Sequence, residues 1–164
     1  MILAMVGTHN QQFNRLLKEL DSLVERGKIK EEVFAQTGCS DFEPKNYKTQ
    51  KMLSLEEYKK LIRKASLVIT HGGAGSIIDA LNERKKLIIV PRLAKFGEHT
   101  NDHQLDLAEA LQRQGKAITI KDIKKLESAI KDARKGKSSF EKDSRLGAEL
   151  RKCLENHETS GSAK

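Results

Sequence analysis

The segment His71-Gly72-Gly73-Ala74-Gly75-Ser76 holds the residues whose types and spacing could best bind a ligand, and it directly follows the apolar run Leu67 to Thr70. Small residues let a ligand approach the backbone closely, and the first N–H groups of a following helix lack partners within it. Such a helix N-terminus favours a phosphate. We expect the three glycines to supply permissive dihedrals and Ser76 to add a hydroxyl donor. The spacing fits neither GxGxxG nor GxxxxGK[ST], and glycine used for packing alone is the competing interpretation.

Asp79 follows Ser76 by three residues and would lie about one turn further along the same helix. A carboxylate at this place can accept hydrogen bonds from two ribose hydroxyls. An acid near a helix start also complements the helix dipole without any ligand, which is the alternative interpretation.

A second polar cluster, Glu98-His99-Thr100-Asn101-Asp102-His103-Gln104, ends the loop that begins after Pro91. In open α/β sheets the loops after the strand carboxyl ends share one crevice, so we expect this cluster to face the glycine turn and bind sugar hydroxyls. His99 and His103 are four residues apart, but HEXXH and a third ligand are absent, so no metal is expected. N-capping of the following helix would explain several of these residues without a ligand.

The turn Gly7-Thr8-His9-Asn10 ends the first apolar run at the same predicted edge. We expect Gly7 and Thr8 to contact the ligand, and contact of this turn with a partner protein is the alternative. His9 and His103 are candidate general bases by position. A single histidine near a helix start is more often a surface or capping residue.

Short apolar runs alternate with amphipathic segments, which indicates βαβ units and an α/β fold with a Rossmann-like parallel sheet covered by helices on both faces. Strands are predicted at Met1 to Val6, Glu32 to Gln36, Thr49 to Leu53, Leu67 to Thr70, Leu87 to Val90 and Lys116 to Ile120. Helices are predicted at Phe13 to Val24, Leu55 to Lys64, the glycine turn to Arg84, Asn101 to Gln114, and Ile123 to Ile130. Ser54 and Glu57 match a capping box at the second helix.

The length of 164 residues suits one domain with a single core. We expect one α/β domain over residues 1–156, with its core at 1–134 and a charged helix at about 140–154. Residues 157–164 are expected to be a disordered tail.

The formal charge of +8 is compatible with nucleic acid, an anionic membrane or an anionic substrate. Trp is absent and aromatics make up 4%, so the stacking platforms of a single-strand binder are missing and no nucleic acid is expected. The basic residues alternate with acids, as in Glu56-Glu57-Tyr58-Lys59-Lys60, which is typical of a solvated face. Cys39 and Cys153 form no CxxC pair. No export signal or membrane-length apolar run is found, so a cytoplasmic location is expected.

The chain resembles the C-terminal, donor-binding domain of GT-B glycosyltransferases of the MurG type. Two segments together carry the resemblance: SLVITHGGAGSIIDAL and VPRLAKFGEHTNDHQLDLAEAL. The resemblance covers residues 1–120. It is closest to the stand-alone subunits of two-chain transferases. These include the catalytic subunit of the dolichol-pathway UDP-N-acetylglucosamine transferase and the PssE-like subunits of bacterial exopolysaccharide and capsule synthesis, to which the PR…EHTNDHQ form is more similar.

This resemblance implies a UDP-sugar donor. It places Met52 and Leu53 where the family's backbone meets uracil, and residues Gly73 to Ser76 on the diphosphate turn. Asp79 stands where MurG-like enzymes carry a ribose-binding glutamate, and it is the shorter acid.

His103 and Gln104 match the polar pair that meets the donor sugar, where MurG has two glutamines. The sugar therefore stays open among N-acetylglucosamine, galactose and glucuronic acid. GT-B enzymes stabilise the leaving diphosphate with protein groups and a helix N-terminus, so the resemblance implies no metal or other cofactor.

The GT-B cleft lies between two domains, and the sequence carries only the donor-binding one. The resemblance implies a membrane-associated second subunit with the acceptor site, a polyprenyl-diphosphate-linked acceptor, and a place at the inner face of the membrane through that partner. A non-catalytic enhancer that stabilises a partner glycosyltransferase is the alternative. An unrelated flavodoxin-like phosphate module is disfavoured, because its ligand loop would follow the first strand, where only Gly7-Thr8 stands.

Overall fold

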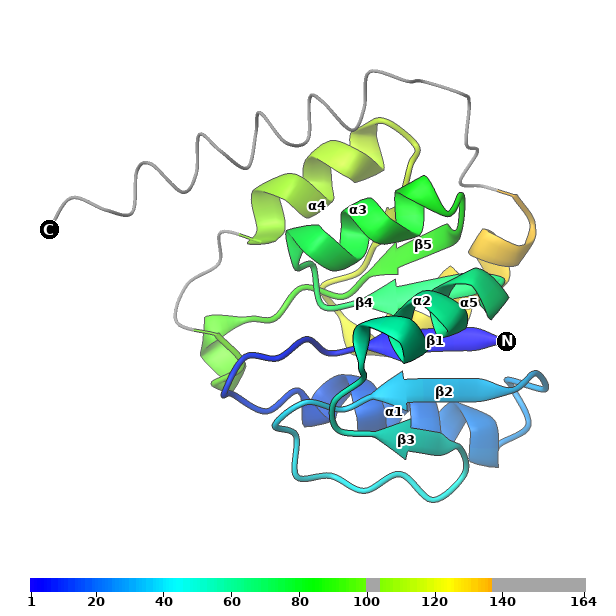
Figure 1. Ribbon diagram of the computed structural model, residues 1–164. Coiled ribbons are helices and arrows are strands. Elements are labelled where there is room, and N and C mark those ends of the chain that lie inside the picture. The colour runs from blue at the N-terminus through cyan, green and yellow to red at the C-terminus, as the bar shows by residue number, and fades with distance from the viewer. Residues whose placement is uncertain (100–103, 137–164) are drawn as a thin grey trace, which may run out of the picture.

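The computed structural model of the chain describes residues 1–99 and 104–136 (Figure 1). Within these two ranges the structure has six strands: β1 (Ile2–Met5), β2 (Val33–Gln36), β3 (Lys48–Gln50), β4 (Leu67–Thr70), β5 (Lys86–Ile89) and β6 (Ile118–Thr119). The α-helices are α1 (Asn14–Glu25), α2 (Leu55–Lys64), α3 (Ala74–Asn82), α4 (Gln104–Arg113) and α5 (Leu126–Arg134). Two 3₁₀ turns are η1 (Ala94–Phe96) and η2 (Ile123–Lys125). The helix predicted at about 140–154 and the tail at 157–164 lie outside the described residues.

All six strands are parallel and follow the order β3-β2-β1-β4-β5-β6, as expected of a doubly wound sheet (Figure 1). The order reverses between β1 and β4, which pair directly. Met5 lies opposite Gln36 on one side and Thr70 on the other. Because these strands end level, the residues that follow them gather at one edge of the sheet.

Helices cover both faces of the sheet, which confirms the predicted fold class. Helices α1 and α5 bury their apolar stripes on one face, and α2, α3 and α4 cover the other (Figure 1). The alternation of a pleated strand divides β1 between these cores: Ile2 and Ala4 join the first, Leu3 and Met5 the second. Each fully buried leucine of α1, such as Leu16 and Leu20, contributes about 1.5–3 kcal/mol to folding.

The capping box predicted at the start of α2 is present. Ser54 Oγ accepts a hydrogen bond from the Glu57 N–H at 3.2 Å, and the Ser54 N–H donates to Glu57 Oε2 at 2.9 Å. Two backbone N–H groups at the helix end are therefore satisfied by side chains, which fixes where α2 begins.

The differences from the predicted elements are local. Strand β3 ends at Gln50 rather than at residue 53, and its three residues are exposed, as befits the outermost strand. The predicted loop after Pro91 contains η1, a single 3₁₀ turn too short to show helical periodicity, which Gly97 ends in the left-handed region. Over the described ranges, no helix is both long and apolar enough to cross a bilayer.

Candidate functional site

A pocket of about 500 Å³ opens at the carboxyl edge of the sheet, where the strand order reverses. Ligands of doubly wound sheets bind at this point, and the volume suits a small molecule. Ten residues that the sequence marked as ligand contacts line it: Gly7, Thr8, Met52, Leu53, His71, Gly73, Ala74, Gly75, Ser76 and Asp79. The topology thus brings together three segments that are far apart in the sequence.

The N-terminus of α3 forms one wall of this pocket. Gly73 is its N-cap and provides no side-chain hydrogen bond to the helix, whose first internal bond runs from the Ile77 N–H to the Gly73 carbonyl at 3.2 Å. The N–H groups of Ala74, Gly75 and Ser76 therefore have no intrahelical partner, and the first turn carries no acid. Free amides and the positive end of the helix dipole make this wall a site for an anion.

Two positions of the site must be glycine, because the His71 ring lies too close to their backbone for a side chain. A Cβ atom at Gly7 would lie 2.6 Å from His71 Cε1, and one at Gly73 would lie 2.4 Å from His71 Nε2. Both contacts are far below van der Waals distance, so the imidazole is wedged between two backbone segments. This wedge sets the spacing between the turn after β1 and the turn before α3.

His71 is partly buried, and removal of its ring from water lowers its pKa to about 4, with the positive charge of Arg92 and the nearby His99 and His9 acting in the same direction. Its Nδ1 lies 3.3 Å from the Met5 carbonyl. A carbonyl only accepts hydrogen bonds, so the neutral ring carries its proton on Nδ1. His71 therefore contributes shape rather than charge to the site at neutral pH.

The predicted use of the glycines for permissive dihedrals is correct for Gly72, whose φ is 102°. It is wrong for Gly73, which is extended with φ −66° and ψ 132°, and for Gly75, which lies inside α3. A Cβ at Gly75 would meet nothing within 4 Å. Gly75 therefore keeps the pocket side of the helix open rather than shaping the turn.

Ser76 uses its hydroxyl within the turn. Its Oγ donates to the Gly73 carbonyl at 2.8 Å and lies 2.6 Å from Thr70 Oγ1. Because the Ser76 proton goes to Gly73, the Thr70 hydroxyl donates to Ser76. The pair stiffens the strand-to-helix junction, and Ser76 becomes a donor to a ligand only when its bond to Gly73 breaks.

Gln36, at the end of β2, is a site residue that the sequence reasoning missed. Its side chain accepts from the Gly7 N–H at 3.1 Å and donates to the Gly7 carbonyl at 2.9 Å and the Lys51 carbonyl at 3.0 Å. It therefore joins the turn after β1 to the segment that carries Met52. Its position as a polar residue ending a buried strand is the signal that could have revealed it.

The outer lip of the pocket is apolar. Met52 is 50% exposed and Leu55, which was also missed, is 68% exposed. Leu53 lies between them and is partly buried. Large apolar side chains exposed beside an anion site can pack against the flat face of a nucleobase.

Asp79 faces the pocket from α3 and is the only carboxylate among its lining residues in the described part of the chain. The Tyr58 hydroxyl, from α2, donates to Asp79 Oδ2 at 2.8 Å. Tyr58 was interpreted as part of a solvated face, because only the sheet topology shows that α2 lies beside α3.

The second polar cluster is only partly described. The rings of His9 and His99 lie 4.8 Å apart, so the turn after β1 and the loop after β5 meet as expected. Asn101 and His103 lie outside the described residues, and Gln104 begins α4 without a described side chain. Contacts of these three residues with a sugar stay predictions.

Glu98 does not lie in the crevice, which corrects its prediction as a sugar contact. Its side chain is wholly buried, and both of its oxygens accept hydrogen bonds from Arg15 at 2.9 Å. The Leu93 N–H donates to Glu98 Oε2 at 3.0 Å. A carboxylate engaged in this way holds its own loop in place and has no path to a ligand in the pocket.

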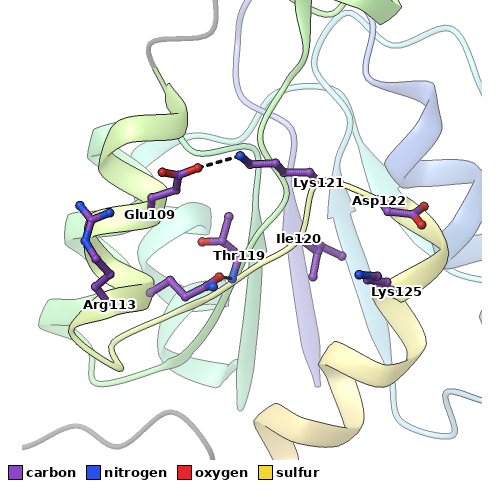
Figure 2. Close-up of a pocket in the computed structure, with 8 residues that line it drawn as sticks. Glu109, Arg113, Thr119, Ile120, Lys121, Asp122 and Lys125 are labelled. Carbon is purple, nitrogen blue, oxygen red and sulfur yellow. Dashed lines mark hydrogen bonds and ion pairs between the residues drawn. The ribbon is translucent and has the colours of Figure 1, made fainter.

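A second pocket, of about 480 Å³, lies beside β6 (Figure 2). There Lys121 pairs with Glu109 at 2.7 Å, the Thr119 N–H donates to Gln112 Oε1, and the Thr119 hydroxyl donates to the Ala108 carbonyl. These polar groups satisfy one another, in contrast to the free amides of α3. In the described ranges, no cluster of three or more His, Cys, Asp or Glu side chains is placed to hold a metal ion.

Comparison with known proteins agrees with this geometry. The model of the glycosyltransferase family 28 C-terminal domain matches residues 1–156. The chain is 40% identical over 60 residues to the UDP-N-acetylglucosamine transferase subunit ALG13 of Homo sapiens and 35% identical over 85 residues to that of Debaryomyces hansenii. These matches cover 37% and 49% of this chain but 5% and 38% of those proteins, so the chain spans the smaller part of its relatives.

Solved glycosyltransferases share the fold. The kitacinnamycin glycosyltransferase superposes with a TM-score of 0.63 and 19% identity, covering 95% of this chain and 39% of that one. MurG of Acinetobacter baumannii superposes with a TM-score of 0.58 and 18% identity, covering 81% of this chain and 40% of that one. A GT-B enzyme therefore contains this sheet as one part of a larger molecule, and the family match over residues 1–156 shows that the chain belongs to the glycosyltransferase family 28 C-terminal domain family.

Proposed function

We propose that the chain is the UDP-sugar-binding catalytic subunit of a two-component glycosyltransferase, which transfers a hexose to a polyprenyl-diphosphate-linked acceptor. One observation carries the proposal: the uncapped N-terminus of α3 opens into a pocket of about 500 Å³ that also holds an apolar lip and a carboxylate. These are the three chemistries that a nucleoside diphosphate requires.

In this proposal the uracil, the ribose and the diphosphate of the donor each contact a different part of the pocket. Uracil lies against Met52, Leu53 and Leu55, which are exposed or partly exposed. The ribose meets Asp79. The diphosphate lies on the free amides of Ala74 to Ser76, so the sugar extends toward the junction of His9 and His99.

The α3 amides then act on the reaction itself. As the bond between the sugar and the diphosphate breaks, negative charge grows on the leaving UDP oxygen. Fixed N–H groups and the helix dipole stabilise this charge without reorganising. His9 is exposed beside His99, two residues after Gly7, and stays a candidate base for the acceptor hydroxyl.

A second subunit supplies the acceptor in this proposal. Two similar proteins are named as subunits of a UDP-N-acetylglucosamine transferase, which supports both a partner and that donor among the three sugars considered. The partner would hold the chain at the inner face of the membrane.

The test begins with calorimetric titration of the full chain with UDP, alone and in complex with a membrane subunit encoded beside it. We expect weak binding by the chain alone and tighter binding in the complex. A panel of radiolabelled UDP-sugars then identifies the donor. Absence of UDP binding even in the complex would refute the proposal.

The role of the site is tested in the same complex with Asp79→Ala. A catalytic subunit loses most of its transfer activity in this variant, because the donor loses its ribose contact. A non-catalytic enhancer would keep its activity, since its partner would hold a donor site of its own.

A further inference from the structure

The hydrogen bond between Tyr58 and Asp79 joins two helices across the pocket. The Tyr58 hydroxyl on α2 donates to Asp79 Oδ2 on α3 at 2.8 Å, and both side chains line the pocket. Helices α2 and α3 lie on either side of β4 in the chain, so only the fold brings these two residues together.

The place of Tyr58 is fixed by the first turn of α2. The Tyr58 N–H makes a helical bond to the Ser54 carbonyl at 2.9 Å, and the Ser54–Glu57 capping box holds the helix start. Met52 and Leu53 come immediately before this cap. The apolar lip and the Tyr58 hydroxyl are therefore held by the same rigid turn.

The direction of this hydrogen bond is fixed by chemistry. Burial raises the pKa of the half-buried Tyr58, and the hydrogen bond and charge of Asp79 raise it further, so the phenol keeps its proton at neutral pH. The phenol donates and the carboxylate accepts. The bond uses one of the carboxylate's two oxygens, and a carboxylate has about four acceptor positions.

We infer that Tyr58 is a positioning and specificity-determining residue of the ribose site, which holds the short Asp79 side chain so that it accepts both the 2′- and 3′-hydroxyls. The inference rests on the proposed function. An aspartate is one methylene shorter than a glutamate, so its reach depends on its orientation. A fixed carboxylate also rejects a 2′-deoxyribose, because a missing hydroxyl leaves an acceptor in the pocket unpaired.

The experiment compares UDP with 2′-deoxy-UDP by calorimetry on the full chain or its complex. We expect the wild-type protein to prefer UDP by about tenfold or more, since a hydrogen bond to a charged group is at stake. In Tyr58→Phe the affinity for UDP falls by about tenfold and that for 2′-deoxy-UDP stays within about twofold, so the preference is lost. An unchanged preference in a folded Tyr58→Phe variant overturns the inference.

A matched control separates positioning from a general loss of stability. Tyr47 is also partly buried, and its hydroxyl donates to the Leu17 carbonyl at 3.0 Å, away from the pocket. Tyr47→Phe removes an equivalent hydroxyl and should leave the ratio of the two affinities at the wild-type value. Equal loss of the ratio in both variants counts against a specific role for Tyr58.

Two double variants test whether Tyr58 acts through Asp79. Adding Tyr58→Phe to Asp79→Ala should cause no further loss of UDP affinity, because the carboxylate is already absent. Adding Asp79→Glu to Tyr58→Phe should restore the preference for UDP, because the longer acid reaches the ribose without help. Additive losses, or no rescue by the glutamate, in double variants that circular dichroism shows to be folded contradict the inference.

The two possible failures are distinct. If the wild-type protein in its complex does not bind UDP, the proposed function fails and this inference with it. If the wild-type protein prefers UDP over its deoxy form and Tyr58→Phe keeps that preference, the donor site stands and only the role of Tyr58 is refuted.

Discussion

At the scale of single residues, some glycines of the site are required because a neighbouring side chain leaves no room for a Cβ atom, and others are not. Gly73 touches His71 so closely that no Cβ fits, whereas a Cβ at Gly75 would enter open space. The two positions are separated by one residue in the same motif. Sequence spacing could not distinguish them, because the difference comes from His71, whose ring the fold places against the turn.

The Gly73→Ala substitution should destabilise the protein by about 1–3 kcal/mol, as expected when atoms are forced into a packed site. Gly75→Ala should be neutral or slightly stabilising, because alanine favours a helix more than glycine does. Its methyl group would still narrow the pocket and weaken UDP binding. Urea denaturation and UDP titration of both variants measure the two effects, and an equally stable Gly73→Ala would refute the wedge at His71.

The pH dependence of stability should reveal His71. Its folded pKa of about 4 lies below the ordinary value of 6.5, so the unfolded chain binds more protons between these values. Stability is therefore complete above about pH 6.5 and falls as the pH is lowered through 4, by about 3 kcal/mol in total.

Urea denaturation between pH 4.5 and 7 checks this, because ordinary carboxylates titrate mainly below that range. His71→Gln should flatten the profile. The exposed His9 serves as the control, and His9→Gln should leave the slope as it is in the wild-type protein. An unchanged slope in His71→Gln would show that the histidine is not buried in the neutral form.

At the scale of elements, Arg92 joins the turn after β1 to the loop after β5. Its wholly buried guanidinium donates to the carbonyls of Val6, Gln11, Gln12 and Glu98. Arg15 and the buried Glu98 form an ion pair beside it. These contacts fix the turn after β1, which lines the pocket, against the loop after β5, so the buried charges of Arg92, Arg15 and Glu98 have a structural role.

Breaking the ion pair with Glu98→Gln should destabilise the protein by about 3 kcal/mol, because it leaves Arg15 nearly buried without its partner charge. The exposed pair of Lys64 and Glu32 is the comparison, and Lys64→Met should leave the denaturation midpoint unchanged. Chemical denaturation measures both. Equal effects of the two substitutions would contradict the structural role given to Glu98.

The strands, the helices and the capping box were predictable from local patterns, since apolar periodicity and cap chemistry act over a few residues. Tyr58 and Glu98 were not, because both are charged or polar residues in polar stretches. Their roles depend on contacts with Asp79 and Arg15, which lie 21 and 83 positions away. The part of the pocket formed by main-chain groups at the start of α3 was also predictable from local patterns. It follows directly from the succession of a strand, a glycine turn and a helix.

At the scale of the whole molecule, an exposed aromatic side chain lies at the same carboxyl edge of the sheet as the pocket. Phe96 in η1 is 48% exposed, and the cationic groups of Arg15 and Lys95 each lie 5.0 Å from its ring. A hollow of about 270 Å³ beside it includes Lys121. An exposed aromatic side chain among cations is typical of an interface, and it lies on the edge that an acceptor subunit would cover.

Phe96→Ser should therefore reduce co-purification with the proposed membrane subunit and leave UDP binding by the chain alone unchanged. Lys28 is exposed at the opposite edge of the sheet, and Lys28→Ser should have no effect on either. Pull-down from detergent and calorimetry measure the two properties. Normal complex formation by Phe96→Ser would place the partner elsewhere.

The free N–H groups at the start of α3 belong to the main chain, and this limits how resistance to an inhibitor bound there could arise. Every residue type except proline presents the same N–H, so no ordinary point mutation deletes these donors. A compound anchored on them would have to be evaded by changes at the rim, such as Met52 or Leu55, where the proposed UDP donor would also bind. Such escape would weaken the donor together with the compound.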